Sequence, residues 1–305
     1  MNGSSLRART KALAPRFVVL GVRNLQMLVR RMRLPKTRQL FNHAASSPEY
    51  LASDQLGLLQ KKYPFQAEYD YDPKSVEARG ELRAREILRH TQSVQAQCFL
   101  ELGCWDGMVS CSLHRRGKQT TAIDLRQEGF DKRAVDEGVT LIQMNAGDLQ
   151  FDDESFDCVF SYDSFEHFRR PDVVLRNALR VLKKIGLLYL EFGPLYLSPY
   201  GQHAYRTITV PYCHLLFTRE TLTEFTVAKR LEPIDFEHVN GWSVTEFRNV
   251  WAENAQRLTC ISTREMLNLR HLDLVDTHPS CFRSKTGNFD DLIVESIKII
   301  FQKTD

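Results

Sequence analysis

Between residues 75 and 192 the chain alternates short apolar segments with amphipathic ones, and this alternation constrains the fold more than any other feature. Buried strands are expected at 98–102, 120–125, 139–144, 157–161 and 187–192, and helices at 75–90, 108–116 and 171–183. Strands that alternate with helices of this length form a parallel sheet with helices on both faces. We therefore predict an α/β fold with a doubly wound sheet, whose ligands bind at the carboxyl ends of the strands.

The chain after residue 192 departs from this regular pattern. A long connection without structure of its own is uncommon in a compact domain and usually carries function. The 305 residues allow one large domain or two. We expect an irregular insertion (193–217), a helix (218–229), a strand (234–239), a helical insertion (240–292) and a late, antiparallel strand (294–303). The resulting division is a basic amphipathic extension (1–40), a connecting or substrate-side segment (41–74) and the main domain (75–305).

A glycine-bearing turn follows the first expected strand. Gly103 and Gly107 allow a ligand to approach the backbone closely, and the amides of the next helix can receive a carboxylate or phosphate. Asp124 ends the second strand, 17 residues beyond Gly107. A carboxylate there can accept hydrogen bonds from both hydroxyls of a ribose, although an acid that starts a helix is the alternative interpretation.

Four motifs in sequence order carry a resemblance to a known family. The segments Glu101–Gly107, Asn145–Phe151, Ser155–Val159 and Glu166–His167 match the patterns E-x-G-C-x-x-G, N/D-A-x-x-L-x-F, S-F-D-x-V and E-H. Over residues 75–192 and the late strand, the chain resembles the class I, Rossmann-like S-adenosylmethionine-dependent methyltransferases of the small-molecule subgroup. A dehydrogenase is a distant hypothesis, because its glycine turn would read G-x-G-x-x-G.

The resemblance implies that S-adenosyl-L-methionine is the cofactor and assigns residues to its methionine and ribose ends. Glu101, Gly103 and Gly107 would shape the methionine pocket, and Asp124 would hold the ribose. The candidate positions beside them in the same two loops are Cys104, Trp105 and Leu125. Trp105 stands where many members of the family have a glycine, so it either covers the cofactor or is simply tolerated.

The same resemblance assigns the adenine and sulfonium ends of the cofactor. Asn145, with the amide of Ala146, matches the position near the adenine amino group, and Asp148 is the alternative. Ser161 would lie beside the sulfonium through its backbone. The implied activity is methylation of a small molecule or glycan, with oxygen as the expected acceptor atom. The alternative is a catalytically silent protein that binds a partner or a membrane.

A hydroxyl acceptor needs a general base, and histidine is the usual choice near pH 7. His203 lies in the loop after the fifth strand, above the expected transfer point, and is the preferred base. His167 in the E-H pair and His214 are further candidates, although the apolar neighbours of His214 indicate a buried packing role. The remaining candidates are Asp163, His238, His271 and His278, and a transfer without any side-chain base is the last alternative.

We predict no metal site. His203 and His214 with Glu191 or Asp163 could in principle bind a divalent ion, but their spacing is not diagnostic.

Residues 1–40 carry ten Lys or Arg and no acidic residue, whereas residues 41–305 have a net charge of −7. Apolar residues interleave with arginines in this arm, which suits a helix lying on an anionic membrane surface. A solvated or packing extension is an equal alternative, and a cleaved organelle-targeting peptide is a third. Nucleic-acid binding ranks below these, because the body is acidic and the arm lacks a stacking pattern.

The seven cysteines are odd in number and contain no C-x-x-C pair. A disulfide scaffold is therefore not expected, and the cytoplasm, with peripheral attachment to a membrane as an option, is the predicted location.

Overall fold

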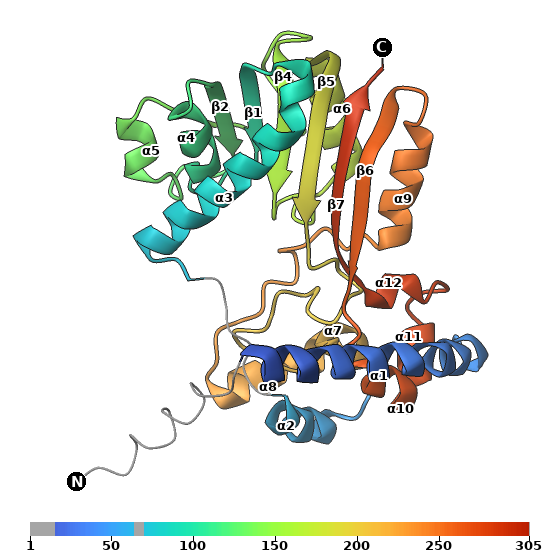
Figure 1. Cartoon of the computed structure of the whole chain (residues 1–305). Helices are drawn as coiled ribbons and strands as arrows, with labels where there is room; N and C mark the ends of the chain where they lie inside the picture. The colour runs from blue at the N-terminus through green and yellow to red at the C-terminus, as the bar shows by residue number, and fades with distance from the viewer. Residues whose placement is uncertain (1–15, 64–69, 305) are drawn as a thin grey trace. The chain divides into compact units, whose positions relative to one another are not determined.

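The computed structural model describes residues 16–63 and 70–304, and the chain packs as two compact units (Figure 1). The helical unit comprises Met1–Glu49 and Leu269–Phe289. The sheet unit comprises Tyr50–Asn268 and Asp290–Asp305. The domain boundaries that we predicted from the sequence, after residues 40 and 74, are not tested by these units and stay a prediction.

The sheet unit holds seven strands in the order β3-β2-β1-β4-β5-β7-β6 (Figure 1). Pairing is parallel from β3 through β5, whereas β7 runs antiparallel to both β5 and β6. The predicted Rossmann-like α/β sheet, mostly parallel with an antiparallel late strand, is therefore confirmed. The strands are β1 (Cys98–Leu102), β2 (Gln119–Asp124), β3 (Thr140–Gln143), β4 (Phe156–Tyr162), β5 (Leu182–Phe192), β6 (Leu258–Leu267) and β7 (Val294–Lys303).

The helices of this unit have bounds close to those expected where the sequence pattern was regular. They are α2 (Ser53–Lys62), α3 (Pro73–Thr91), η2 (Gln92–Val94), α4 (Met108–His114), α5 (Lys132–Asp136), α6 (Pro171–Val181), α7 (Cys213–Leu216), α8 (Arg219–Lys229), α9 (Val244–Glu253) and α12 (Asp290–Ile293).

Two apolar layers show that helices cover both faces of the sheet. Successive residues of a strand point to opposite faces, so Phe99 and Leu100 of β1 enter different layers. Phe99 packs with residues of α3 and α4, including Ile87 and Leu113. Leu100 packs with residues of α6 and α9, including Phe247. The sheet is thus a double-sided core that holds the strand ends rigidly.

One expected strand was wrong. Residues 234–239 form a loop, in which the Asp235 carboxylate accepts the amide of Glu237 at 2.9 Å. This turn and the preceding Pro233 override the alternation of apolar and polar residues that suggested a strand. The edge position belongs instead to β6, which lies within the insertion 240–292 that was expected to be helical.

Segment α2 contacts the irregular residues 193–217. The Gln60 side chain donates to the Thr207 carbonyl at 3.2 Å and accepts the Thr209 amide at 2.9 Å. Leu56 is completely buried. Helix α2 and the first insertion therefore pack together within the sheet unit.

The helical unit contains α1 (Arg16–His43), α10 (Leu272–Thr277) and α11 (Pro279–Arg283). Arg33 of α1 pairs with Asp276 at 2.5 Å, and the buried ring of Phe41 meets Phe289 edge to face at 5.5 Å. Residues 1–15 of the predicted basic extension lie outside the described residues. Among the described helices, none is long and apolar enough to cross a membrane.

Candidate active site

The turn after β1 depends on two glycines with left-handed backbone conformations. Gly103 has φ 69° and Gly107 has φ 73°. A Cβ at Gly103 would lie 2.6 Å from the Ser164 Cβ, and one at Gly107 would lie 2.8 Å from a methyl group of Leu141. The left-handed conformation therefore favours glycine at both positions, and at Gly103 the close approach of Ser164 also leaves no space for a side chain.

Glu101 lies at the base of this turn with its carboxyl group buried. Its Oε2 accepts hydrogen bonds from the backbone amide of Ser110 at 3.1 Å and from the Ser110 hydroxyl at 2.6 Å. Burial raises the pKa of Glu101 to about 8, although the bonds from Ser110 oppose this shift. Near pH 7 this carboxyl group is therefore largely protonated.

Asp124 closes β2 and ties its own loop to the glycine turn. Its Oδ2 accepts the Trp105 amide at 2.9 Å, and its Oδ1 accepts the Arg126 amide at 3.0 Å. Each carboxylate oxygen retains a further acceptor site, so two ribose hydroxyls could still bind. The Trp105 side chain is 46% exposed, and the Arg126 guanidinium lies over its ring at 5.3 Å.

The segment after β3 lies directly beside Asp124, because the Met144 amide donates to the Asp124 carbonyl at 2.8 Å. Asn145 forms a tight turn in which its Oδ1 accepts the Gly147 amide at 2.8 Å. Ala146 is buried, whereas Asp148 is exposed and binds the Gln150 side chain at 2.8 Å. The structure thus gathers these candidates with Asp124 at one edge of the sheet.

The end of β4 is joined to the glycine turn by two hydroxyl groups. Ser161, which is fully buried, donates to the Leu102 carbonyl at 2.9 Å. Ser164 donates to the Gly103 carbonyl at 2.7 Å. Ser161 therefore lies next to the turn, and its role beside a sulfonium stays a prediction.

The structure brings together two of the three histidines proposed as bases. The rings of His167 and His203 meet edge to face at 4.9 Å, and His238 joins them at 4.4 Å from His167. Burial lowers the pKa of His167 to about 4 and that of His203 to about 3, so both rings are neutral at pH 7. Because a ring with such a low pKa binds a proton weakly, either histidine is a less efficient general base near pH 7.

His214 has different surroundings. Its Nε2 lies 2.6 Å from the Tyr196 carbonyl oxygen, and its ring packs at 4.7 Å from the Tyr196 ring. Burial lowers the pKa of His214 to about 4. These contacts fit the packing role that its apolar sequence neighbours indicate. Of the remaining candidates, Asp163 forms an ion pair with Arg83.

The sequence did not predict the grouping of His167, His203 and His238. They come from the loop after β4, the loop after β5 and the residues that precede α9, and no motif spacing links them. His271 and His278 belong to the helical unit.

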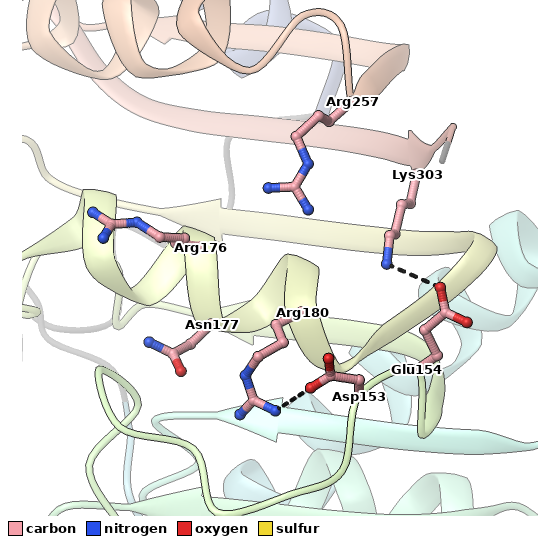
Figure 2. Close-up of a pocket in the computed structure, with 7 residues that line it drawn as sticks. All are labelled: Asp153, Glu154, Arg176, Asn177, Arg180, Arg257 and Lys303. Atoms are coloured by element: carbon pink, nitrogen blue, oxygen red, sulfur yellow. Dashed lines mark hydrogen bonds and ion pairs between the residues drawn. The ribbon is translucent and has the colours of Figure 1, made fainter.

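A separate pocket of about 560 Å³ lies at the other end of the strands, where β4 begins and β7 ends (Figure 2). Two ion pairs lie in its lining, Arg180 with Asp153 at 2.7 Å and Lys303 with Glu154 at 3.6 Å, and basic residues outnumber acidic ones. Its residues are Asp153, Glu154, Arg176, Asn177, Arg180, Arg257 and Lys303. This pocket is not formed by the predicted site residues.

The doubly wound sheet, the glycine turn and the polar residues at the ends of β2 and β3 define the class I methyltransferase architecture. Residues 100–190 match the family described as a methyltransferase domain. This match supports the resemblance to the class I, Rossmann-like S-adenosylmethionine-dependent methyltransferases that the sequence motifs indicate.

Two relatives illustrate the similarity in sequence. The chain is 33% identical over 127 residues to a fatty-acid O-methyltransferase of Mycolicibacterium smegmatis, covering 38% of this chain and 46% of that protein. It is 27% identical over 175 residues to a ubiquinone biosynthesis O-methyltransferase of Xanthomonas oryzae pv. oryzae, covering 49% and 67%. The chain thus spans about half the length of the first of these relatives.

Among solved structures, the PH0226 protein of Pyrococcus horikoshii OT3 has a TM-score of 0.46 and 17% identity. That alignment covers 77% of this chain and 94% of the other.

Proposed function

We propose that this protein transfers a methyl group from S-adenosyl-L-methionine to an oxygen atom of a small molecule. The observation that carries the proposal is the convergence of Glu101, Asp124 and Asn145 at the ends of three adjacent strands, around a turn that requires glycine. Both relatives described above are named as O-methyltransferases, which supports oxygen as the acceptor atom.

The residues at this edge fit the chemistry of the cofactor. The Glu101 carboxyl can ionise against the methionine ammonium, and the Asp124 oxygens have acceptor sites for the ribose hydroxyls. The exposed Asn145, or alternatively Asp148, is available to the adenine amino group. When bound, the cofactor supplies an electrophilic methyl group on a positively charged sulfur.

The protein's own contribution would be to align the acceptor oxygen with the methyl carbon and to exclude water. As the oxygen–carbon bond forms and the carbon–sulfur bond breaks, the acceptor hydroxyl loses its proton. His203 remains our first candidate to accept that proton, with His167 beside it. Both rings are neutral near pH 7 and can therefore act as acceptors.

We favour a small acceptor over a glycan. The insertion 193–217, packed against α2, supplies the surface where the acceptor would bind. Tyr212 in this insertion is buried, and its hydroxyl donates to the Leu292 carbonyl at 2.9 Å, so it serves packing. The first molecules to test are fatty acids and ubiquinone precursors, because these classes appear in the names of the two relatives.

We also propose that α1 contacts an anionic membrane surface. Leu25, Leu28, Val29 and Met32 are each more than half exposed and follow the spacing i, i+3, i+4, i+7. Residues at this spacing share one helix face, and the exposed Arg31 lies among them. An apolar face bordered by arginines suits the interface of a bilayer that contains anionic lipids.

We further propose that the protein lies in the cytoplasm, at the surface of such a membrane. The seven cysteines are all free, and five of them are buried. Free, buried thiols are typical of proteins in a reducing compartment.

Calorimetry with S-adenosyl-L-methionine, followed by methyl transfer to the acceptor panel, tests the proposed activity. Cofactor binding with transfer to a panel member is expected. Binding without transfer to any acceptor would favour the catalytically silent alternative, and absence of binding would contradict both the cofactor and the activity.

A further inference from the structure

Three histidines from distant parts of the sequence form a cluster in the sheet unit. One ring nitrogen from each of His167, His203 and His238 lies within 4.8 Å of the corresponding atoms of the other two. His167 and His203 are half-buried, and His238 is exposed. The cluster brings three potential metal-ligand atoms close together.

Two of the rings are oriented by backbone carbonyl groups. The Nδ1 of His167 lies 2.7 Å from the His238 carbonyl oxygen, and the Nε2 of His203 lies 3.1 Å from the Pro194 carbonyl oxygen. A ring nitrogen that donates to a carbonyl leaves the other nitrogen with its lone pair free. Metal-binding histidines in proteins are held in the same way by carbonyl or carboxylate groups.

A buried carboxyl group next to the cluster gives a second, independent observation. Glu166 is 2% exposed, and its Oε1 lies 4.0 Å from the His167 Nε2 while accepting the Gly193 amide at 3.0 Å. The other oxygen, Oε2, is buried and has no hydrogen-bond partner among the described residues. A polar atom left unsatisfied in the interior is costly, so a cation or hydrogen-bond donor beside Oε2 would stabilise this region.

We propose that His167, His203 and His238 bind one divalent transition-metal ion of the zinc class. Imidazole nitrogens suit Zn²⁺, Ni²⁺ and Cu²⁺, whereas Mg²⁺ and Ca²⁺ select oxygen ligands. Zinc–nitrogen bonds of about 2.0–2.1 Å place tetrahedral ligand atoms roughly 3.4 Å apart, so the cluster needs only a modest contraction. The exposed His238 has the freedom to make that adjustment.

Three protein ligands leave a fourth position for water or for an oxygen of a bound molecule. Phe168, next to His167, comes within 3.3 Å of the Cβ position at Gly103, so the open position would lie near the glycine turn. Only the expectation that this position receives the acceptor oxygen rests on the proposed function. An ion bound to the free nitrogen of His203 would occupy its lone pair, so the general-base role proposed above applies to the metal-free protein.

Metal titration of the full-length protein tests the site without any measurement of activity. After treatment with a chelator, Co²⁺ is added while its visible absorption is followed, and the Zn²⁺ dissociation constant is obtained by competition with a chromogenic chelator. The variants are His238→Ala, whose backbone carbonyl still accepts from His167, and His203→Gln. His114→Gln in α4 is the matched control, and thermal melting verifies that each variant is folded.

We expect one ion per chain and a tetrahedral Co²⁺ spectrum. His238→Ala should weaken Zn²⁺ binding by at least about 100-fold, and His114→Gln should leave it unchanged. A stoichiometry near zero, or equal affinity in wild type and His238→Ala, would overturn the site. S-adenosyl-L-methionine binding is measured in parallel. The result of the metal titration does not depend on whether the cofactor binds, so the metal site and the proposed function are tested separately.

Discussion

Glu101 receives both hydrogen-bond donors of Ser110, the amide at 3.1 Å and the hydroxyl at 2.6 Å, on a single carboxyl oxygen. Even with this support, burial raises the pKa of Glu101 to about 8. The residue at the base of the glycine turn thus carries a desolvation cost that the hydrogen bonds from Ser110 do not fully compensate. A cationic ligand beside it would relieve that cost.

This raised pKa predicts a pH dependence of stability in the absence of cofactor. The folded-state pKa of Glu101 exceeds the unfolded value of 4.5, so its favourable contribution is complete below pH 4.5 and is lost as the pH rises towards 8. Glu101→Gln removes this loss and should be more stable than wild type at pH 8 by at least about 1 kcal/mol. Urea unfolding at pH 5 and pH 8 measures the difference, with the exposed Glu128→Gln as control. If the free energy of unfolding fell equally between pH 5 and pH 8 in wild type and Glu101→Gln, the raised pKa of Glu101 would be contradicted.

The same carboxyl group predicts proton release when the cofactor binds. A methionine ammonium next to Glu101 favours the ionised form, so binding at pH 7 should release protons in wild type and fewer in Glu101→Gln. Calorimetry in two buffers with different ionisation enthalpies reports the number of protons released. Equal release by both proteins would place the ammonium elsewhere.

The histidine cluster predicts a separation of catalysis from cofactor binding. His203→Gln should lower turnover by about 100- to 10,000-fold with little change in cofactor affinity, because His203 acts on the acceptor. His214→Gln should mainly reduce stability, by about 1–3 kcal/mol, since it replaces the imidazole ring packed against Tyr196 with a buried amide. Steady-state kinetics and urea unfolding of both variants supply the test. Full activity of His203→Gln would exclude His203 from the transfer step.

The apolar face of α1 predicts membrane binding that depends on salt. Because Thr37 and Phe41 of the same helix are buried, point substitutions are preferable to deletion of the arm. Leu28→Glu with Met32→Glu should weaken binding to vesicles that contain anionic lipids, and raising the salt concentration should weaken wild-type binding. The control is Leu82→Glu, an exposed position on α3. Failure of wild type to sediment with such vesicles at low salt would leave α1 as a packing element.

The sequence was sufficient for those parts of the fold whose local pattern agreed with their burial. The run Cys98–Leu102 is almost entirely buried and was predicted with its correct ends. By contrast, β6 is mostly exposed at the sheet edge, so its Thr, Ser and Arg residues show no apolar alternation. Such an edge strand is defined by its pairing with β7, which the local sequence does not encode.

The candidate site divides in the same way. Glu101, Asp124 and Asn145 could be predicted because each follows or ends a recognisable strand, and strand ends meet at one edge of a parallel sheet. The His167, His203 and His238 cluster could not, because three irregular segments bring its members together. His238 in particular lies in residues that the sequence suggested were a strand.

The central claim is that Asp124 holds the ribose of S-adenosyl-L-methionine, and calorimetric titration of Asp124→Ala tests it most directly. The variant loses two charge-assisted hydrogen bonds, each typically worth about 1.5–3 kcal/mol, so its dissociation constant should rise at least about tenfold. Asp136→Ala, an exposed acid in α5, should bind like wild type. Because Asp124 also accepts the Trp105 and Arg126 amides, a thermal melt must show that the variant is folded. An unchanged dissociation constant in folded Asp124→Ala would contradict the cofactor site.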